Sequence, residues 1–458
     1  MSTTPANQID SVADFRSEVT IPCGYAFPTV YFLDNEMFKR SLTEIPRMDF
    51  QVSAGIRNLV GSTEDRQGAA LLYFRMVHPW MPFISKKLFY DQLLSPLAPL
   101  RAENILLFAC MKLAVSSPRD NSPRNSQYLT VKLELFKAEI AGVLTFRALQ
   151  AWVLMSLYEV GHGIYPAAYI SISTSARYAS ALGVTASRES LSGFPSGWIS
   201  AEERKRTWWA VRILDCYANL GIRDRPLATK DPKQDDTLPM DDVAWDHGGP
   251  EPRSAFTLST PPSPAMGRFN LLAQAANLLG QVLRHICEHD ADREFHAQEA
   301  EILERTLIAL TNVSREESRT RGMGICGPTT VCHSARVALN FRATASGTES
   351  WAIDDIRVAP VAKYEVAEEI LKLSRWALST VQPNTGELSN ADEVSPFLLD
   401  CMYRTATLYA QLYCEVGDQA YAEASKDAKK ALSWLNRRWA AAGEYITLLD
   451  AWDASHIY

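Results

Sequence analysis

Apolar residues recur three and four positions apart along most of this chain, whereas strict alternation of apolar and polar residues is almost absent. The first spacing is that of one face of an α-helix, and alternation is that of a half-buried strand. The pattern therefore predicts an all-α protein, built as a large multi-helix array. Helices are expected near residues 65–76, 86–93, 101–116, 127–141, 144–160, 165–182, 200–221, 266–289, 293–312, 328–343, 360–380, 394–415 and 418–441.

Segments rich in proline, glycine and serine separate the predicted helices. The longest is DHGGPEPRSAFTLSTPPSPAMG, residues 246–267. Such length and composition are typical of a surface loop. We therefore predict two unequal parts joined by this loop. The expected organisation is a mostly irregular N-terminal segment (1–45), a first helical half (46–245), the loop (246–267) and a C-terminal helical half (268–458).

One predicted helix, EERKRTWWAVRILD at residues 202–215, combines basic residues with paired tryptophans. Ser200 and Glu203 have the spacing of a capping box, which predicts that the helix begins there and continues to about Gly221. Apolar residues occupy most of its circumference. A helix of this kind is surrounded by protein on most sides.

The charged residues of this helix have separate expected roles. Arg206 points to the apolar side, where an unpaired charge is costly, so it requires a hydrogen-bonded partner. Arg212 has the spacing to meet Asp215 on one side and the Trp208 ring on the other. Asp215 would be a general base in a catalytic interpretation, but no histidine, serine or second carboxylate supports it at a suitable spacing. We expect Asp215 to anchor a loop or a helix end.

Composition and charge exclude several classes. Hydrophobic residues make up 47% of the chain and charged residues 22%, which is ordinary globular usage. The net charge of −7 argues against direct nucleic-acid binding through the overall field. The longest apolar run, 105–115, contains a lysine and is too short to span a membrane, and no secretory signal is found. Eight scattered cysteines are typical of reduced thiols in a cytosolic or nuclear protein.

Residues 202–242 resemble the central signature of the fungal-specific transcription factor domain, the middle homology region of fungal zinc-cluster regulators. Acidic residues precede a basic run, paired tryptophans, an aspartate, an Arg-Pro pair and a Leu-Pro pair. Segments 73–89, 146–184 and 435–452 are similar to further helices of that family. Asp224 is a departure, because the family often has glycine before Arg-Pro. The signature residues here are Arg206, Trp208, Trp209, Asp215, Arg225, Pro226, Leu238 and Pro239.

The resemblance implies a nuclear, non-enzymatic transcriptional regulator of a metabolic or secondary-metabolite gene cluster, with no cofactor. The family usually carries six closely spaced zinc-binding cysteines near the N-terminus, but only Cys23 precedes Phe74. We therefore expect DNA contact through a partner, either a DNA-binding transcription factor or the transcription machinery, in a homo- or heterodimer. An inhibitory scaffold that pairs with a zinc-cluster regulator is an alternative.

Aromatic residues crowd the two predicted helices over 144–182 and are candidates for an effector cavity. The alternative is that these rings only pack the core. The candidates are Trp152, Tyr158, Tyr165, Tyr169 and Arg177.

A rival hypothesis comes from the motif HICEH. On a helix, His285 and His289 share a face and are spaced to bind zinc, with Glu288 as the base of a metal-dependent hydrolase. Such enzymes also need a downstream glutamate and a mixed α/β domain. The all-α pattern favours an ordinary amphipathic helix, so we expect no metal site and no catalytic residue.

Overall fold

The computed structural model describes residues 29–40, 50–95, 100–117, 122–187, 197–222, 225–251, 255–287, 293–320, 327–340, 367–372, 375 and 390–455. Within these ranges every regular element is helical, and Thr237 and Thr257 form an isolated antiparallel bridge. The predicted all-α class is therefore confirmed. No helix in the described ranges combines the length and the apolar composition needed to cross a membrane.

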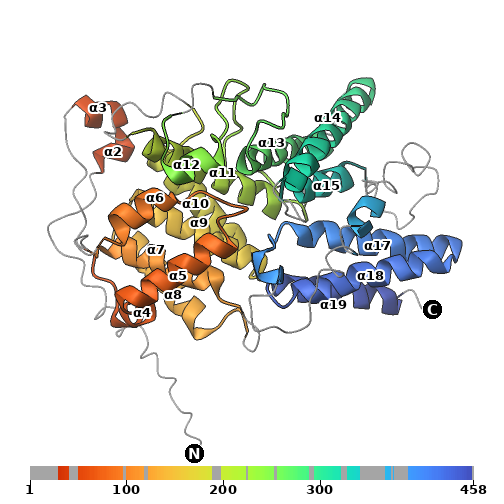
Figure 1. Ribbon diagram of the computed structural model, residues 1–458, viewed down its shortest axis with the longest axis horizontal. Coiled ribbons are helices and arrows are strands. Elements are labelled where there is room, and N and C mark those ends of the chain that lie inside the picture. Colours follow the sequence, from red (N-terminus) through yellow and green to blue (C-terminus); the bar gives the residue numbers. More distant parts are fainter. Residues whose placement is uncertain are drawn as a thin grey trace, which may run out of the picture.

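α9 lies within the first group of helices (Figure 1). Residues 148–161 of α9 are all buried, and α9 packs against α7, α8, α10 and α11. A single π-helical turn, Phe89–Leu93, continues α6. The helices are α2 (Val30–Leu33), α3 (Asn35–Arg40), α4 (Ala54–Val60), α5 (Thr63–Met76), α6 (Lys86–Leu88), α7 (Ala102–Val115), α8 (Ser126–Ile140), α9 (Phe146–Gly161), α10 (Ala167–Ala181), α11 (Trp198–Ala218) and α12 (Asp242–His247).

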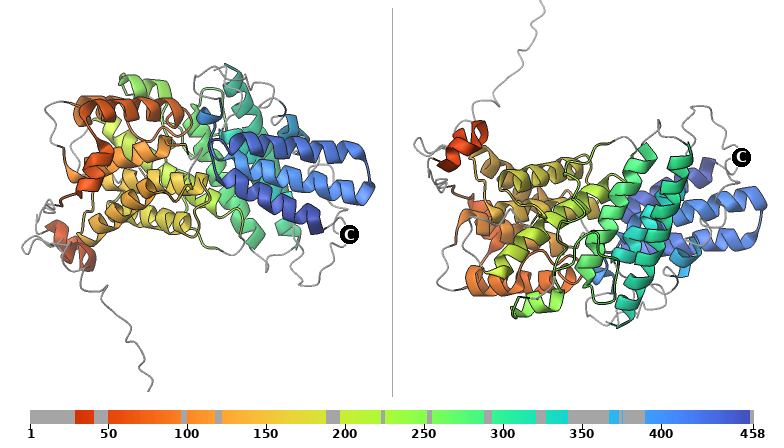
Figure 2. Two further views of the ribbon diagram at one scale, coloured as in Figure 1. Left: turned by 90° about the horizontal axis from the view of Figure 1, so that it is seen from below. Right: turned by 90° about the horizontal axis from the view of Figure 1, so that it is seen from above.

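The second group continues from α11. α13 contacts α11, α14 and α15, and α17 connects α15 with α18 and α19. In both views of Figure 2, α17, α18 and α19 lie side by side at the end of the molecule opposite α4 and α5. The helices are α13 (Arg268–Cys287), α14 (Arg293–Thr320), α15 (Gly327–Asn340), α17 (Leu398–Val416), α18 (Gln419–Leu435) and α19 (Ala441–Ser455).

One hydrophobic core extends through both groups. It includes residues from Val52 in the first group to Leu449 in the second. A smaller cluster joins residues 367 and 371 to α17 and α18. The described helices on either side of segment 246–267 therefore share one core.

Two close contacts between helices depend on glycine. A Cβ on Gly280 of α13 would lie 2.6 Å from Nη2 of Arg212 on α11. A Cβ on Gly161 of α9 would lie 2.2 Å from the ring of Trp439, which precedes α19. Real Cβ atoms do not approach so closely, so the absence of a side chain permits both contacts.

The boundaries of α11 differ from the prediction. α11 begins at Trp198 with Gly197 as its N-cap, and it ends at Ala218. Ser200 lies inside the helix, so the predicted capping box is wrong. The reason is that the Glu203 carboxylate accepts hydrogen bonds from groups on other elements, including the amide of Ser85 at 2.9 Å. Tertiary contacts thus override the local capping signal.

Candidate regulatory site

Arg206 of α11 has no solvent exposure. Its Nε donates to Glu202 at 2.9 Å and its Nη1 donates to Asp242 at 2.8 Å. Its Nη2 donates to the carbonyl of Met240 at 2.7 Å. Burial alone would lower the pKa of Arg206, but Asp242 and Glu202 outweigh it and the pKa is raised. The expected partners of Arg206 are confirmed.

Two buried glutamates tie α11 to its neighbours. Glu202 accepts from the amide of Met240 at 2.7 Å. Glu203 accepts from Arg147 at 2.9 Å and from the buried Gln150 at 3.2 Å. Because each acceptor is buried, removal of one leaves donors unsatisfied rather than solvated. The two acidic residues at the start of the signature therefore connect α11 with α9 and with the chain that follows α11.

Asp215 anchors that following chain, as predicted. Its Oδ2 accepts from the amide of Thr229 at 2.8 Å and from the Thr229 hydroxyl at 2.7 Å. Arg212 also turns toward this segment, donating to Thr229 Oγ1 at 3.0 Å and to Asp231 at 2.7 Å. The neighbour pair expected between Arg212 and Asp215 is replaced by this shared contact with Thr229.

The remaining signature residues extend the same attachment. Trp208 and Trp209 meet edge to face, and the indole of Trp209 donates to the carbonyl of Thr237 at 3.3 Å. Leu238 and Pro239 are buried. Near α10, the Arg225 guanidinium lies 4.9 Å from the ring centre of Tyr169, and Pro226 is exposed. The signature thus fastens segment 225–242 along α11.

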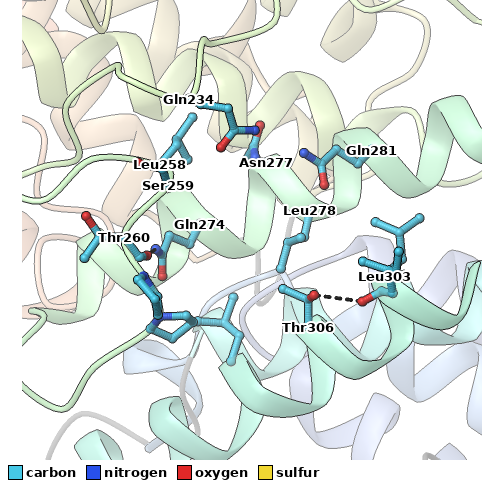
Figure 3. A pocket seen from close by; sticks show the side chains of 14 residues that line it. Gln234, Leu258, Ser259, Thr260, Gln274, Asn277, Leu278, Gln281, Leu303 and Thr306 are labelled. Atoms are coloured by element: carbon cyan, nitrogen blue, oxygen red, sulfur yellow. Dashed lines mark hydrogen bonds between the residues drawn. The ribbon is translucent and has the colours of Figure 1, made fainter. Parts of the chain in front are cut away.

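A cavity of about 260 Å³ lies beside the fastened segment (Figure 3). We name it the carboxamide cavity. One wall comes from the chain after α11, the second from α13 and the third from α14. Its lining residues are Gln234 and 258–262, then Gln274, Asn277, Leu278 and Gln281, and finally Ile302, Leu303, Thr306 and Leu310.

The α13 wall is polar but uncharged. Gln274, Asn277 and Gln281 lie three and four positions apart, and therefore on one face of the helix. Gln274 Nε2 donates to the carbonyl of Thr260 at 2.9 Å. Its Oε1 is buried and has no hydrogen-bond partner, and the residue as a whole is 6% exposed. No charged residue of the described chain lines the cavity.

The residues predicted to line an effector cavity do not line this one. Trp152 and Tyr158 are buried in the core, and the Tyr158 hydroxyl donates to the carbonyl of Pro123 at 2.8 Å. Tyr165 and Arg177 are exposed, and Tyr169 is half-buried. Ligand binding by these five residues stays a prediction. The carboxamides that do line a cavity were missed, although three at helical spacing within an apolar helix are a readable signal.

The first histidine of the motif HICEH contacts two residues of α14. His285 Nδ1 lies 2.7 Å from Glu299 Oε2, and its ring stacks on His296 with centres 3.7 Å apart. Glu288 and His289 lie outside the described residues. The described ranges contain no group of three or more histidine, cysteine or carboxylate side chains placed to hold a metal. Nothing in this part of the chain supports the hydrolase alternative.

Comparison with known proteins matches this chain to a fungal transcription factor domain and to fungal transcription factors. The model of the fungal specific transcription factor domain matches residues 70–313, more than half of the chain, including α11 and the carboxamide cavity. Transcription factor BOA15 of Botryotinia fuckeliana (strain B05.10) is 38% identical over 136 residues, which are 29% of this chain and 76% of that protein.

A second relative is the pigment biosynthesis transcriptional activator pigB of Monascus ruber. It is 26% identical over 271 residues, which are 56% of this chain. This chain spans about half, 47%, of the Monascus protein. No solved structure matches the chain.

Proposed function

Because this chain belongs to the fungal-specific transcription factor domain family, we propose that it controls a metabolic or secondary-metabolite gene cluster in the fungal nucleus. The name of the Monascus relative, an activator of pigment biosynthesis, supports a secondary-metabolite target. The observation that carries the proposal is the use of the signature charges inside the protein. Arg206, Arg212 and Asp215 are buried and form hydrogen bonds with residues that follow α11. Such residues build a scaffold for binding and regulation, not a reaction centre.

We further propose that the protein reaches DNA through a partner. The basic residues of α11 support this view. Lys205 pairs with Glu202 at 3.0 Å, and the Arg204 guanidinium lies 4.8 Å from the ring centre of Phe146. In α18, Lys429 pairs with Asp450 at 3.0 Å. Cations with such partners are poorly placed to neutralise phosphates.

The test combines gene deletion with chromatin mapping. Deletion is expected to lower the transcripts of one gene cluster, and crosslinking is expected to place the protein at the promoters of that cluster. The purified full chain should give no mobility shift with the same promoter DNA unless the co-purified DNA-binding partner is added.

Each opposite result contradicts a definite part of the proposal. Binding of naked promoter DNA by the purified chain contradicts the need for a partner. A rise of the target transcripts on deletion favours the inhibitory scaffold. Unchanged transcripts across the genome contradict a regulatory function.

A further inference from the structure

We propose that two copies of this chain associate through the exposed face of α8, with the two helices antiparallel. This inference goes beyond the regulatory function proposed above and does not depend on it. The observation that carries it is a row of four large apolar side chains on α8, each 39–61% exposed. We name this row the α8 stripe, and its members are Leu129, Leu133, Phe136 and Ile140.

The α8 stripe is the outer face of a helix whose inner face is firmly held. α8 packs against α4, α7 and α9. The buried Glu134 carboxylate accepts from the amide of Ser53 at 2.7 Å. The Phe136 ring meets the buried Trp152 of α9 edge to face, with centres 5.6 Å apart. A partner would therefore bind a preformed surface and would order few side chains on binding.

A continuous apolar row differs from the single exposed apolar residues that every protein surface carries. Contiguous exposed patches of a few hundred Å² are often functional contact surfaces. No other helix of the described ranges exposes four large apolar side chains at helical spacing. The α8 stripe is therefore a contact surface rather than an ordinary solvated face.

The spacing of the stripe selects a second copy of the same helix as its occupant. Successive members lie four, three and four residues apart, which is the spacing of a coiled-coil seam. This order of spacings is the same from either end of the helix. In an antiparallel second copy, Leu129 lies opposite Ile140 and Leu133 lies opposite Phe136. The stripe is thus complementary to itself about a two-fold axis, as a symmetric dimer interface requires.

The charges beside the stripe favour the antiparallel arrangement. In that arrangement Lys137 lies across from Thr130 of the second copy, and Glu139 lies across from Lys132. A parallel pair would instead place Lys137 beside Lys132, whose amine already pairs with the buried Glu159 at 2.8 Å. Antiparallel helices also set the positive end of one dipole beside the negative end of the other. Like charges therefore do not meet in the proposed pair.

The size of the stripe predicts a reversible dimer. Its four residues expose roughly 400 Å² in each copy. Stable interfaces bury about 800 Å² per partner, so the stripe forms the apolar centre and its polar neighbours form the rim. We expect a dissociation constant on the order of 10 µM. Association therefore depends on the concentration of the protein.

The test is sedimentation equilibrium of the full chain at about 1–100 µM. The mean mass is expected to rise from that of the monomer toward twice that value. Leu133→Glu places a carboxylate at the centre of the interface and should weaken association at least tenfold. Leu448→Glu changes a leucine of similar exposure on α19 and should leave association unchanged. Circular dichroism checks that each variant is folded.

A pair of further variants tests the antiparallel register. Leu129→Glu and Ile140→Lys should each weaken association, because a symmetric dimer carries each change twice. In an equimolar mixture, the new carboxylate of one chain lies opposite the new ammonium group of the other, and the second such contact keeps its native residues. Mixed dimers should therefore form at least tenfold more tightly than dimers of either variant. Both changes suit the helix dipole, so α8 should stay folded.

Three results would overturn the inference. A monomer throughout the concentration range means that the stripe stays open, is covered by another part of the chain or binds a different protein. A dimer that persists in folded Leu133→Glu places the interface elsewhere. A mixture that associates no better than its components excludes the antiparallel pairing. None of these results changes the expected transcripts or promoter occupancy, so the regulatory function is accepted or rejected separately.

Discussion

At the scale of single residues, the charged side chains of α11 act as fasteners for the backbone that follows it. Asp215 holds Thr229, and Arg206 holds Met240. These contacts are buried, so water cannot replace them when a partner is removed. A signature that looks chemically reactive in the sequence is thus explained by the cost of burying loop backbone without hydrogen-bond partners.

The fastening role of Asp215 can be tested by replacing one acceptor. Asp215→Asn keeps the shape but removes the charge that accepts two hydrogen bonds from Thr229, so we expect the free energy of unfolding to fall by about 2 kcal/mol. Amide hydrogen exchange of residues 225–242 should also become faster. Asp235→Asn, at an exposed position of the same segment, is the control. Equal exchange in both variants would show that Asp215 does not hold the segment.

At the scale of elements, the close packing of α13 on α11 depends on a glycine, which has no side chain to hold the helices apart. Gly280 lets α13 approach α11 where Arg212 reaches Thr229 and Asp231. α13 also supplies the carboxamide wall of the cavity. The contact between these two helices therefore positions the fastened segment and the cavity together.

Two glycine substitutions separate helix propensity from this contact. Gly68→Ala lies in α5 with open space around the new Cβ, so it should stabilise the protein by about 0.5–1 kcal/mol. Gly280→Ala gains the same propensity, but its Cβ displaces Arg212, so we expect a net loss of about 1–3 kcal/mol. Urea unfolding of the two variants measures the difference. Stabilisation by both substitutions would mean that Arg212 moves aside without cost.

At the scale of the whole molecule, the C-terminal helices are attached to the first group through a short buried segment. Arg438 donates to the carbonyl of Ser116 at 2.8 Å and to that of Ala114 at the end of α7. Trp439 packs on Gly161, and the amide of Ala440 donates to His162 Nδ1 at 3.2 Å. Burial and Arg438 lower the pKa of His162 well below its usual value. A neutral histidine is thus part of this attachment.

Acid should therefore destabilise the fold. His333 is fully buried, and burial with nearby Arg315 and Arg336 lowers its pKa to about 3. Glu369 lies 3.8 Å from its Nε2, too far for a hydrogen bond that would hold a proton. The unfolded chain takes up this proton near pH 6.5, so stability present at neutral pH is lost as pH falls from about 6.5 toward 3.

The histidine effect is measurable between two pH values. At pH 5.5 the loss from His333 should be about 1.4 kcal/mol relative to pH 7.5, and the lowered pKa of His162 acts in the same direction. Urea unfolding of the protein and of His333→Leu at both values tests this expectation. In the variant, the difference in the free energy of unfolding between pH 7.5 and pH 5.5 should be smaller by about the same amount. If this difference is the same in both proteins, His333 takes up a proton in the folded state at pH 5.5.

The sequence alone determined the helical class, most helix positions and the burial of α11, because helical periodicity is a property of neighbouring residues. It also identified Arg206 as a buried charge in need of a partner and Asp215 as an anchor. It missed α4 and α12, which are seven and six residues long, because so few residues show little periodicity. Family resemblance rather than periodicity indicated the region of α19.

Only the tertiary structure decided the partners of these residues and the place of the cavity. Glu203 binds Ser85, 118 positions away, in place of the predicted contact with Ser200. The cavity combines residues from two loop segments, Gln234 and 258–262, with residues of α13 and α14. Periodicity specifies which face of a helix is buried, but the crossing of helices specifies what that face meets.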